Sequence, residues 1–184
     1  MFKNIFILIF ITLFIVSCWS SETNSKTWLI ETQTDNISIS IPSSWKVIKA
    51  TDDILPKSKS WKIELAVMSE NAVNGFSNNL LILSDDLNKV TTSKEYSMLN
   101  NIWAQTDYLD YTKIESRDIT FLDNEVSTLY VFEARYNLDT PKLKFLQTAH
   151  ICNWNKAYFF TLAIPTTIND ISKYEYLLST FKCK

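Results

Sequence analysis

Glycine and histidine are nearly absent from this chain of 184 residues, which contains one of each, Gly75 and His150. A single glycine excludes the G-x-G-x-x-G dinucleotide-binding turn, the phosphate-binding P-loop and the G-x-S-x-G turn of serine hydrolases. A single histidine excludes the H-E-x-x-H zinc helix and any site built from two histidines. The motifs of nucleotide-dependent enzymes, serine hydrolases and histidine-rich metalloenzymes are therefore missing.

The chain also lacks a strong charge of either sign. Its 18 Lys and Arg residues and 20 Asp and Glu residues give a formal net charge of −2, which provides no positive field for holding nucleic acid. Hydrophobic residues make up 46% of the chain and aromatic residues 14%, enough to bury a core in a chain whose length suits one domain. We therefore expect a single folded domain and no nucleic-acid partner.

The first 18 residues form the most specific segment of the sequence. Lys3 precedes a run from Ile5 to Val16 that is apolar apart from Thr12. As a helix this run would rise only ~18 Å, short of the ~30 Å hydrocarbon core of a bilayer, and its length is typical of an export signal. The run ends in Ile-Val-Ser-Cys at positions 15–18, which resembles the lipobox of bacterial lipoproteins.

That resemblance implies cleavage after Ser17, so that residues 1–17 are a lipoprotein signal peptide and Cys18 carries diacylglycerol and an acyl chain such as palmitate. Two or three acyl chains anchor a protein stably, whereas one binds only marginally. Residues 18–27 are rich in Ser and Thr, which predicts a flexible, lipidated tether. Trp19, where Asp would favour the inner membrane, favours the outer membrane facing the periplasm if the host has two membranes. An ordinary signal peptide or a retained anchor helix is the alternative.

Export would place the other two cysteines, Cys152 and Cys183, in a compartment where disulfides persist. A bridge between them would tie the last predicted helix to a strand and contribute about 3–4 kcal/mol in the chain-entropy model. The alternative is two separate buried thiols, because spacing alone does not show how closely the Cα atoms approach. His150 lies two residues before Cys152, but the sequence nominates no orienting group for it. We therefore expect a structural histidine and no catalytic residue.

The spacing of apolar residues predicts strands and two helices. Helical spacing covers residues 91–109, opened by a Thr92–Glu95 capping box, and residues 169–181, with a weaker Thr167–Asp170 pair. Alternating or continuous apolar runs predict strands at 37–41, 46–48, 61–68, 79–83, 113–121, 126–136, 143–152 and 157–164, with a loop over 49–60. Short turns favour antiparallel neighbours. We therefore expect an α+β fold over residues 28–184, an antiparallel β-sheet with two main helices packed on it.

Several strings within this order resemble the PsbP-like fold, named after an extrinsic photosystem II subunit and shared by a yeast Ran-binding import factor and DcrB-like bacterial lipoproteins. They are the Ile39-Ser-Ile-Pro42 opening that runs to Trp45, the hairpin at 122–124, the strand at 157–163 and the helix ending in Ser179-Thr-Phe181. The resemblance covers residues 28–183. It implies an α/β sandwich with no shared catalytic centre, whose members act as assembly factors, scaffolds or partners in protein complexes.

Six tryptophans supply the remaining candidates. Trp45 and Trp103 fall on core-facing patterns, so we expect both to pack inside. Trp61 and Trp154 stand beside predicted turns, where exposed aromatic side chains can anchor a protein partner. The acidic pairs, such as Asp52-Asp53, lack a calcium-loop pattern, so we expect neither metal nor cofactor.

The sequence therefore predicts a non-enzymatic, lipid-anchored protein of the bacterial cell envelope that binds another protein or helps to assemble a complex. The alternative is an envelope carrier or sensor that holds a small amphiphilic ligand in a cleft between sheet and helix. The missing motifs argue against a third possibility, a hydrolase.

Overall fold

The computed structural model describes residues 28–49, 61–73 and 75–184. The predicted signal peptide, the lipidation site Cys18, the tether and nearly all of the predicted 49–60 loop lie outside these residues. The described chain forms, in order, β1 (Leu29–Gln33), β2 (Ile37–Pro42), β3 (Trp45–Val47), β4 (Lys62–Val73), β5 (Phe76–Asp86), α1 (Ser93–Asp107), β6 (Leu109–Thr120), β7 (Val126–Arg135), β8 (Leu143–Cys152), β9 (Lys156–Pro165), α2 (Ser172–Ser179) and β10 (Lys182–Cys183).

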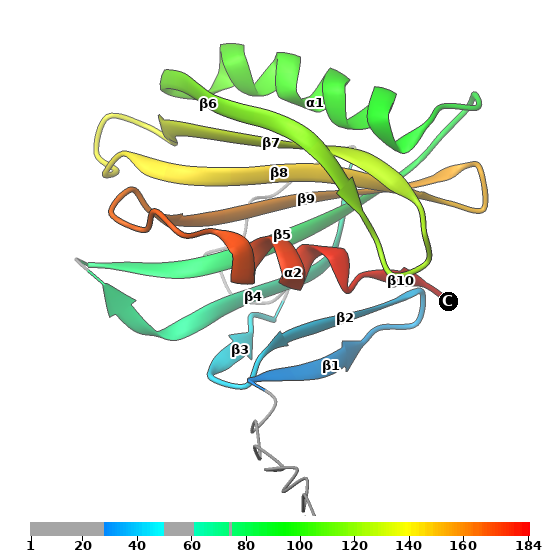
Figure 1. Ribbon diagram of the computed structural model, residues 1–184, viewed down its shortest axis with the longest axis horizontal. Helices are drawn as coiled ribbons and strands as arrows, with labels where there is room; N and C mark the ends of the chain where they lie inside the picture. Colours follow the sequence, from blue (N-terminus) through cyan, green and yellow to red (C-terminus); the bar gives the residue numbers. More distant parts are fainter. Residues whose placement is uncertain (1–27, 50–60, 74) are drawn as a thin grey trace, which may run out of the picture.

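Seven strands form one antiparallel sheet in the order β3-β4-β5-β9-β8-β7-β6 (Figure 1). Strands β6 to β9 follow one another as hairpins, and β9 then pairs with β5. At the β6–β7 turn Asn124 has φ 68, a left-handed conformation that Asn tolerates where many hairpins use glycine. The predicted antiparallel α+β fold with two helices is confirmed.

A second sheet of three strands, in the order β1-β2-β10, lies beside the first. The sequence predicts a half-buried strand here, because isoleucine and serine alternate from Ile37 to Ile41. In the structure Ser38 is buried as well, and the backbone N–H of Ser40 donates to the hydroxyl of Thr180 at the end of α2 (2.9 Å). Strand β2 is thus buried along nearly its whole length, because β1 and β10 pair with its two edges and the end of α2 lies against it. Strands β1 and β10 are not predicted by the sequence.

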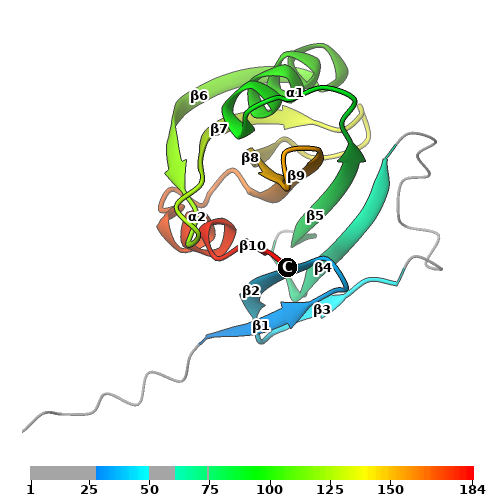
Figure 2. The same ribbon diagram turned by 90° about the vertical axis from the view of Figure 1, so that its right-hand side faces the viewer.

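The main hydrophobic core lies between the large sheet, α2 and the small sheet, while α1 covers the opposite face of the large sheet (Figure 2). Helix α2 faces this core with its predicted apolar stripe, whose members are all buried: Ile171, Tyr174, Leu178 and Phe181. The helix is shorter than predicted, and the expected Thr167–Asp170 cap is wrong. The N-cap is Ile171, without a side-chain cap, and the Asp170 carboxylate instead accepts from the N–H of Ser172 (3.0 Å). Neither helix in the described part of the chain is long and apolar enough to cross a membrane.

Candidate functional site

Helix α1 begins where its predicted capping box places it. The Thr92 hydroxyl accepts from the backbone N–H of Glu95 (3.2 Å), and the Glu95 carboxylate accepts from the backbone N–H of Thr92 (2.9 Å). The Glu95 carboxylate also accepts from the Thr92 hydroxyl (3.0 Å), and the two hydrogen bonds to this carboxylate, chiefly the one from the Thr92 backbone, lower the pKa of Glu95. The box satisfies two backbone donors that the first turn would otherwise leave unpaired.

The face of α1 that lies against the sheet is mostly polar. Its buried residues are Ser93, Tyr96, Ser97, Asn100, Asn101 and Ala104. Ser97 donates to the carbonyl of Thr128 on β7 (2.7 Å), and the amide of Asn101 donates to the hydroxyl of Tyr111 on β6 (3.0 Å). Small side chains allow the helix to approach the strands closely, and the hydrogen bonds offset the loss of water around the buried polar groups.

The outer face of α1 is apolar and exposed to solvent. Met98, Leu99, Ile102 and Trp103 are respectively 46%, 40%, 50% and 51% exposed. Positions 98 and 102, and likewise 99 and 103, are four residues apart and so lie one above the other. The expectation that Trp103 packs inside is wrong, because the Ser and Asn face of the helix takes the buried position. The result is a continuous apolar surface, which we call the α1 outer face: Met98, Leu99, Ile102 and Trp103.

Trp61 and Trp154, the two predicted partner-binding residues, are 39% and 66% exposed. They lie at the same end of the large sheet, because Trp61 precedes the start of β4 and Trp154 lies in the turn between β8 and β9. Trp154 has φ 60 and its neighbour Asn153 has φ 51, left-handed values that a tight turn without glycine imposes. Trp45, expected to pack inside, is half-buried against the main core. The α1 outer face is thus the larger apolar surface, and sequence reasoning did not identify it.

Two hollows among the described residues bear on the carrier alternative. One lies beside α1, between Trp61, Tyr96 and Phe159, and has no room for a water molecule. The other has a volume of about 240 Å³ and mainly polar walls, which include Asn36, Lys156 and the sulfur-bearing residue Cys152. Ligand pockets for amphiphiles are larger and mostly apolar. Neither hollow favours a carrier.

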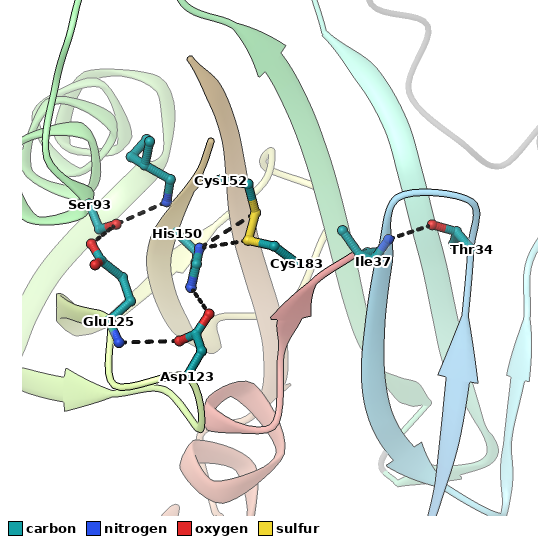
Figure 3. The surroundings of a disulfide bond; sticks show 9 residues. Thr34, Ile37, Ser93, Asp123, Glu125, His150, Cys152 and Cys183 are labelled. Atoms are coloured by element: carbon teal, nitrogen blue, oxygen red, sulfur yellow. Dashed lines mark hydrogen bonds and ion pairs between the residues drawn. A yellow bond between two sulfur atoms is a disulfide. The ribbon is translucent and has the colours of Figure 1, made fainter. Parts of the chain in front are cut away.

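His150 is a buried titratable residue of the large sheet, and it lies against a disulfide. Cys152 and Cys183 are bonded to each other, with 5.9 Å between their Cα atoms. The Nδ1 atom of His150 lies 3.7 Å from the sulfur of Cys152 and 3.5 Å from that of Cys183, as Figure 3 shows. Its Nε2 atom lies 2.9 Å from the carboxylate of Asp123. The bridge therefore ties β10 to the end of β8, with the histidine ring beside it.

The hydrogen bond to Asp123 holds the ring of His150 in one orientation, and burial of the ring favours its neutral form. Burial lowers its pKa below the ordinary value of 6.5, although the nearby carboxylate of Asp123 opposes this effect. Because a carboxylate only accepts hydrogen bonds, Nε2 carries the hydrogen and donates it to Asp123. The lone pair of Nδ1 then points at the two sulfur atoms. Asp123 is the orienting group that the sequence did not nominate, because it lies 27 positions away along the chain.

Comparison with solved structures identifies the fold of the chain. No protein-family model and no curated protein matches the chain. The solution structure of cyanobacterial PsbP (CyanoP) from Synechocystis sp. PCC 6803 superimposes with a TM-score of 0.57 and 13% sequence identity, over 85% of this chain and 92% of that chain. A crystal structure from Bacteroides thetaiotaomicron VPI-5482 gives a TM-score of 0.39 and 8% identity, over 80% of this chain and 45% of that one, too distant to define a fold. The chain therefore has a PsbP-like fold, as the resemblance in its sequence implied.

Proposed function

We propose that this chain is a non-enzymatic, lipid-anchored module of the bacterial cell envelope, akin to DcrB-like lipoproteins, and that it binds a partner protein through the α1 outer face. The exposed apolar face of α1 is the observation that carries the proposal. Each 100 Å² of apolar surface removed from water contributes roughly 2.5 kcal/mol. A protein partner that covers Leu99, Ile102 and Trp103 would gain this contribution, and tryptophan surrounded by aliphatic side chains is typical of the centre of protein interfaces.

The position of α1 favours a protein rather than the anchoring bilayer as the occupant of this face. Helix α1 lies at the opposite end of the molecule from β1, where the described chain begins (Figures 1 and 2). An anchor at Cys18, joined to the domain at residue 28, would hold the β1 end nearest the membrane. The α1 outer face would then face away from it, where another envelope protein can reach it.

The charge on α1 supports the same conclusion. Helices that lie on membranes carry many Lys and Arg residues along their polar side. Helix α1 carries a single basic residue, Lys94, and its ammonium group pairs with Asp118 of β6 (2.8 Å). Its other charged residues, Glu95 and Asp107, are acidic and exposed. An apolar surface with little charge around it suits the centre of a protein interface, which is depleted in charged residues.

The experiment that tests binding is photo-cross-linking in the protein's own cells from a photoreactive residue at position 99. One captured protein should dominate, and its capture should be lost in Ile102→Lys, which places a charge in the centre of the α1 outer face. The matched control is Tyr176→Lys, because Tyr176 is 54% exposed on α2 and lies outside this face. If Ile102→Lys and Tyr176→Lys retain equal capture, the α1 outer face is not the binding surface.

The anchor is tested separately. Replacing Cys18 with Ser should move the protein from the membrane fraction to the soluble fraction and abolish labelling by a clickable fatty acid fed to the cells. Membrane retention of the Cys18→Ser variant, or an unlabelled parent protein, would remove the lipid anchor from the proposal while leaving the α1 interface to be judged by cross-linking.

A further inference from the structure

The ring of His150 and the two sulfur atoms beside it form a cluster that the partner-binding role does not use. His150 and Cys152 lie on the same face of β8, two residues apart, and β10 brings Cys183 to them. Each residue offers one ligand atom, and the three atoms lie within 4.8 Å of one another. His150 and Cys152 are buried and Cys183 is half-buried. One imidazole nitrogen and two sulfurs are the donor atoms that Zn²⁺ prefers in proteins.

The spacing of these atoms fits a tetrahedral zinc ion. With Zn–S near 2.3 Å and Zn–N near 2.05 Å, tetrahedral geometry requires N···S distances of ~3.5 Å and an S···S distance of ~3.8 Å. The Nδ1 atom of His150 already lies 3.5 Å and 3.7 Å from the two sulfurs. Only the two sulfurs must separate. Strand β10 consists of two residues paired with β2 alone, so Cys183 is the ligand that can move.

The surroundings of His150 are those of a zinc-bound histidine. Such a ligand usually donates its second ring N–H to a carboxylate, which fixes the ring and makes the coordinating nitrogen more basic. Asp123 takes this position at 2.9 Å from Nε2. Its other oxygen accepts from the backbone N–H of Glu125 (3.2 Å), so the carboxylate is itself held in place.

The polar hollow of about 240 Å³ at Cys152 provides a path for the ion and room for a fourth ligand. Lys156 and Lys184 lie in its walls, and both already have partners. Lys156 pairs with Asp86 (2.9 Å), and Lys184 donates to the carbonyl of Thr34 (2.9 Å). Two thiolates and one Zn²⁺ leave no net charge at the site. A water molecule from the hollow can complete the four-coordinate geometry.

We propose that the reduced chain binds one Zn²⁺ through Nδ1 of His150 and the thiolates of Cys152 and Cys183, so that the disulfide and the zinc site are alternative states of the same residues. A dithiol reductant supplies two electrons and two protons, its own thiols become a disulfide, and the Cys152–Cys183 bond becomes two thiols. Zinc binding then releases the two thiol protons. An oxidant that accepts two electrons restores the disulfide and expels the ion.

The test compares zinc binding by the oxidised and reduced full-length chain in detergent, with Cys18→Ser in every sample so that no third thiol takes part. After removal of the reductant under argon, zinc is titrated against a chromogenic chelator. The reduced protein should bind one Zn²⁺ and the oxidised protein none. Cobalt in place of zinc should give the absorption bands of a tetrahedral thiolate site.

Two variants separate this site from a chance pair of thiols. His150→Gln removes a ligand, and Asp123→Asn keeps all three ligands but loses the carboxylate behind the ring; both should weaken zinc binding, the second by about 10- to 100-fold. Asp139→Asn, an exposed substitution in the turn between β7 and β8 at the other end of the sheet, should bind like the parent. Circular dichroism follows folding, and if reduction unfolds the chain, zinc should refold it. The proposal is overturned if the reduced chain fails to bind stoichiometric zinc, folded or not, or if His150→Gln binds as tightly as the parent.

Discussion

Helices α1 and α2 cover opposite faces of the same sheet, and they place opposite sides of their sequences against it. Helix α2 buries Tyr174, Leu177 and Leu178 and exposes Tyr176. Helix α1 buries serine and asparagine side chains and exposes Ile102 and Trp103. Both helices show apolar residues at helical spacing, so the spacing identifies the helix but not the side that faces the protein's own core.

The difference lies in what each helix meets. Helix α2 packs between the two sheets, where large apolar side chains fill the main core and the Cys152–Cys183 bridge holds the neighbouring strand. Helix α1 crosses strands whose own aromatic side chains, Phe132 and Phe145, already fill the space between helix and sheet. Only small or hydrogen-bonding residues of α1 fit there, and the apolar side of the helix is left exposed to solvent.

The largest expected difference in stability is between two leucine-to-alanine variants, one on each helix. Leu178→Ala on α2 should lower the free energy of unfolding by about 3–5 kcal/mol, because a fully buried leucine leaves a cavity. Leu99→Ala on α1 should change it by less than about 0.5 kcal/mol, because that side chain contributes little to the folded core. Urea unfolding followed by tryptophan fluorescence measures both. Equal losses in the two variants would show that α1 packs against its own domain with its apolar side.

Loss of the disulfide should lower the free energy of unfolding slightly less than Leu178→Ala does. The contacts that it removes lie on the α2 side of the sheet. Cys152→Ala combined with Cys183→Ala opens a loop of 31 positions, for which the chain-entropy model gives about 3.5 kcal/mol. The measurement is urea unfolding of the double variant beside the oxidised parent, with the reduced, zinc-free parent expected to match the variant. Unfolding free energies that are equal in all three samples would mean that the bridge contributes nothing to stability.

Whether the sequence predicted a feature depends on how far apart along the chain its interacting residues lie. The α1 capping box, the strands from β4 to β9 and the apolar stripe of α2 depend on residues close in sequence, and all were predicted. Strands β1 and β10 depend on pairing with β2, and β10 has only two residues, too few to produce a pattern. The contact of Asp123 with His150 spans 27 positions, so no local motif contains it.

The exposed face of α1 did leave a signal in the sequence. Ser93, Ser97, Asn100, Asn101 and Ala104 recur at helical spacing, as a small and polar stripe opposite the apolar one. Local pattern alone favours burial of the apolar stripe, and only the crowded aromatic surface of the sheet beneath α1 reverses that choice. A stripe of Ser, Asn and Ala opposite an apolar stripe is therefore a reason to consider both orientations of a helix.

The polar side of α1 makes a smaller but measurable contribution to folding. In Asn101→Ala the hydroxyl of Tyr111 loses the partner that lies 3.0 Å away. We expect a loss of about 1 kcal/mol in the free energy of unfolding, because a half-buried hydroxyl loses its hydrogen-bond partner. Thr106→Ala, at an exposed position of the same helix, serves as control and should stay within about 0.5 kcal/mol. A stabilised Asn101→Ala variant would show that the helix does not depend on these hydrogen bonds.

The smallest effect is a dependence of stability on pH, and it comes from His150 in the oxidised, disulfide-bonded protein. Burial lowers the pKa of His150 below its ordinary value of 6.5, with the Asp123 carboxylate opposing, so the unfolded chain takes up a proton first as the pH falls. Stability should therefore be constant above about pH 7.5 and decline as the pH falls from about 6.5 through the pKa of the folded state, by about 1.4 kcal/mol for each unit of pKa shift.

Because His150 is the single histidine of the chain, its imidazole signals in NMR report this titration directly. The midpoint in the folded protein should lie below 6.5. Asp123→Asn should move it lower still, because the carboxylate that favours the charged ring is gone, whereas Tyr176→Phe on the exposed side of α2 should leave it unchanged. A midpoint above 6.5 would mean that the attraction of Asp123 exceeds the effect of burial, and stability would then rise on mild acidification. Such a rise in the free energy of unfolding would be the opposite of what burial of an uncharged imidazole beside the disulfide predicts.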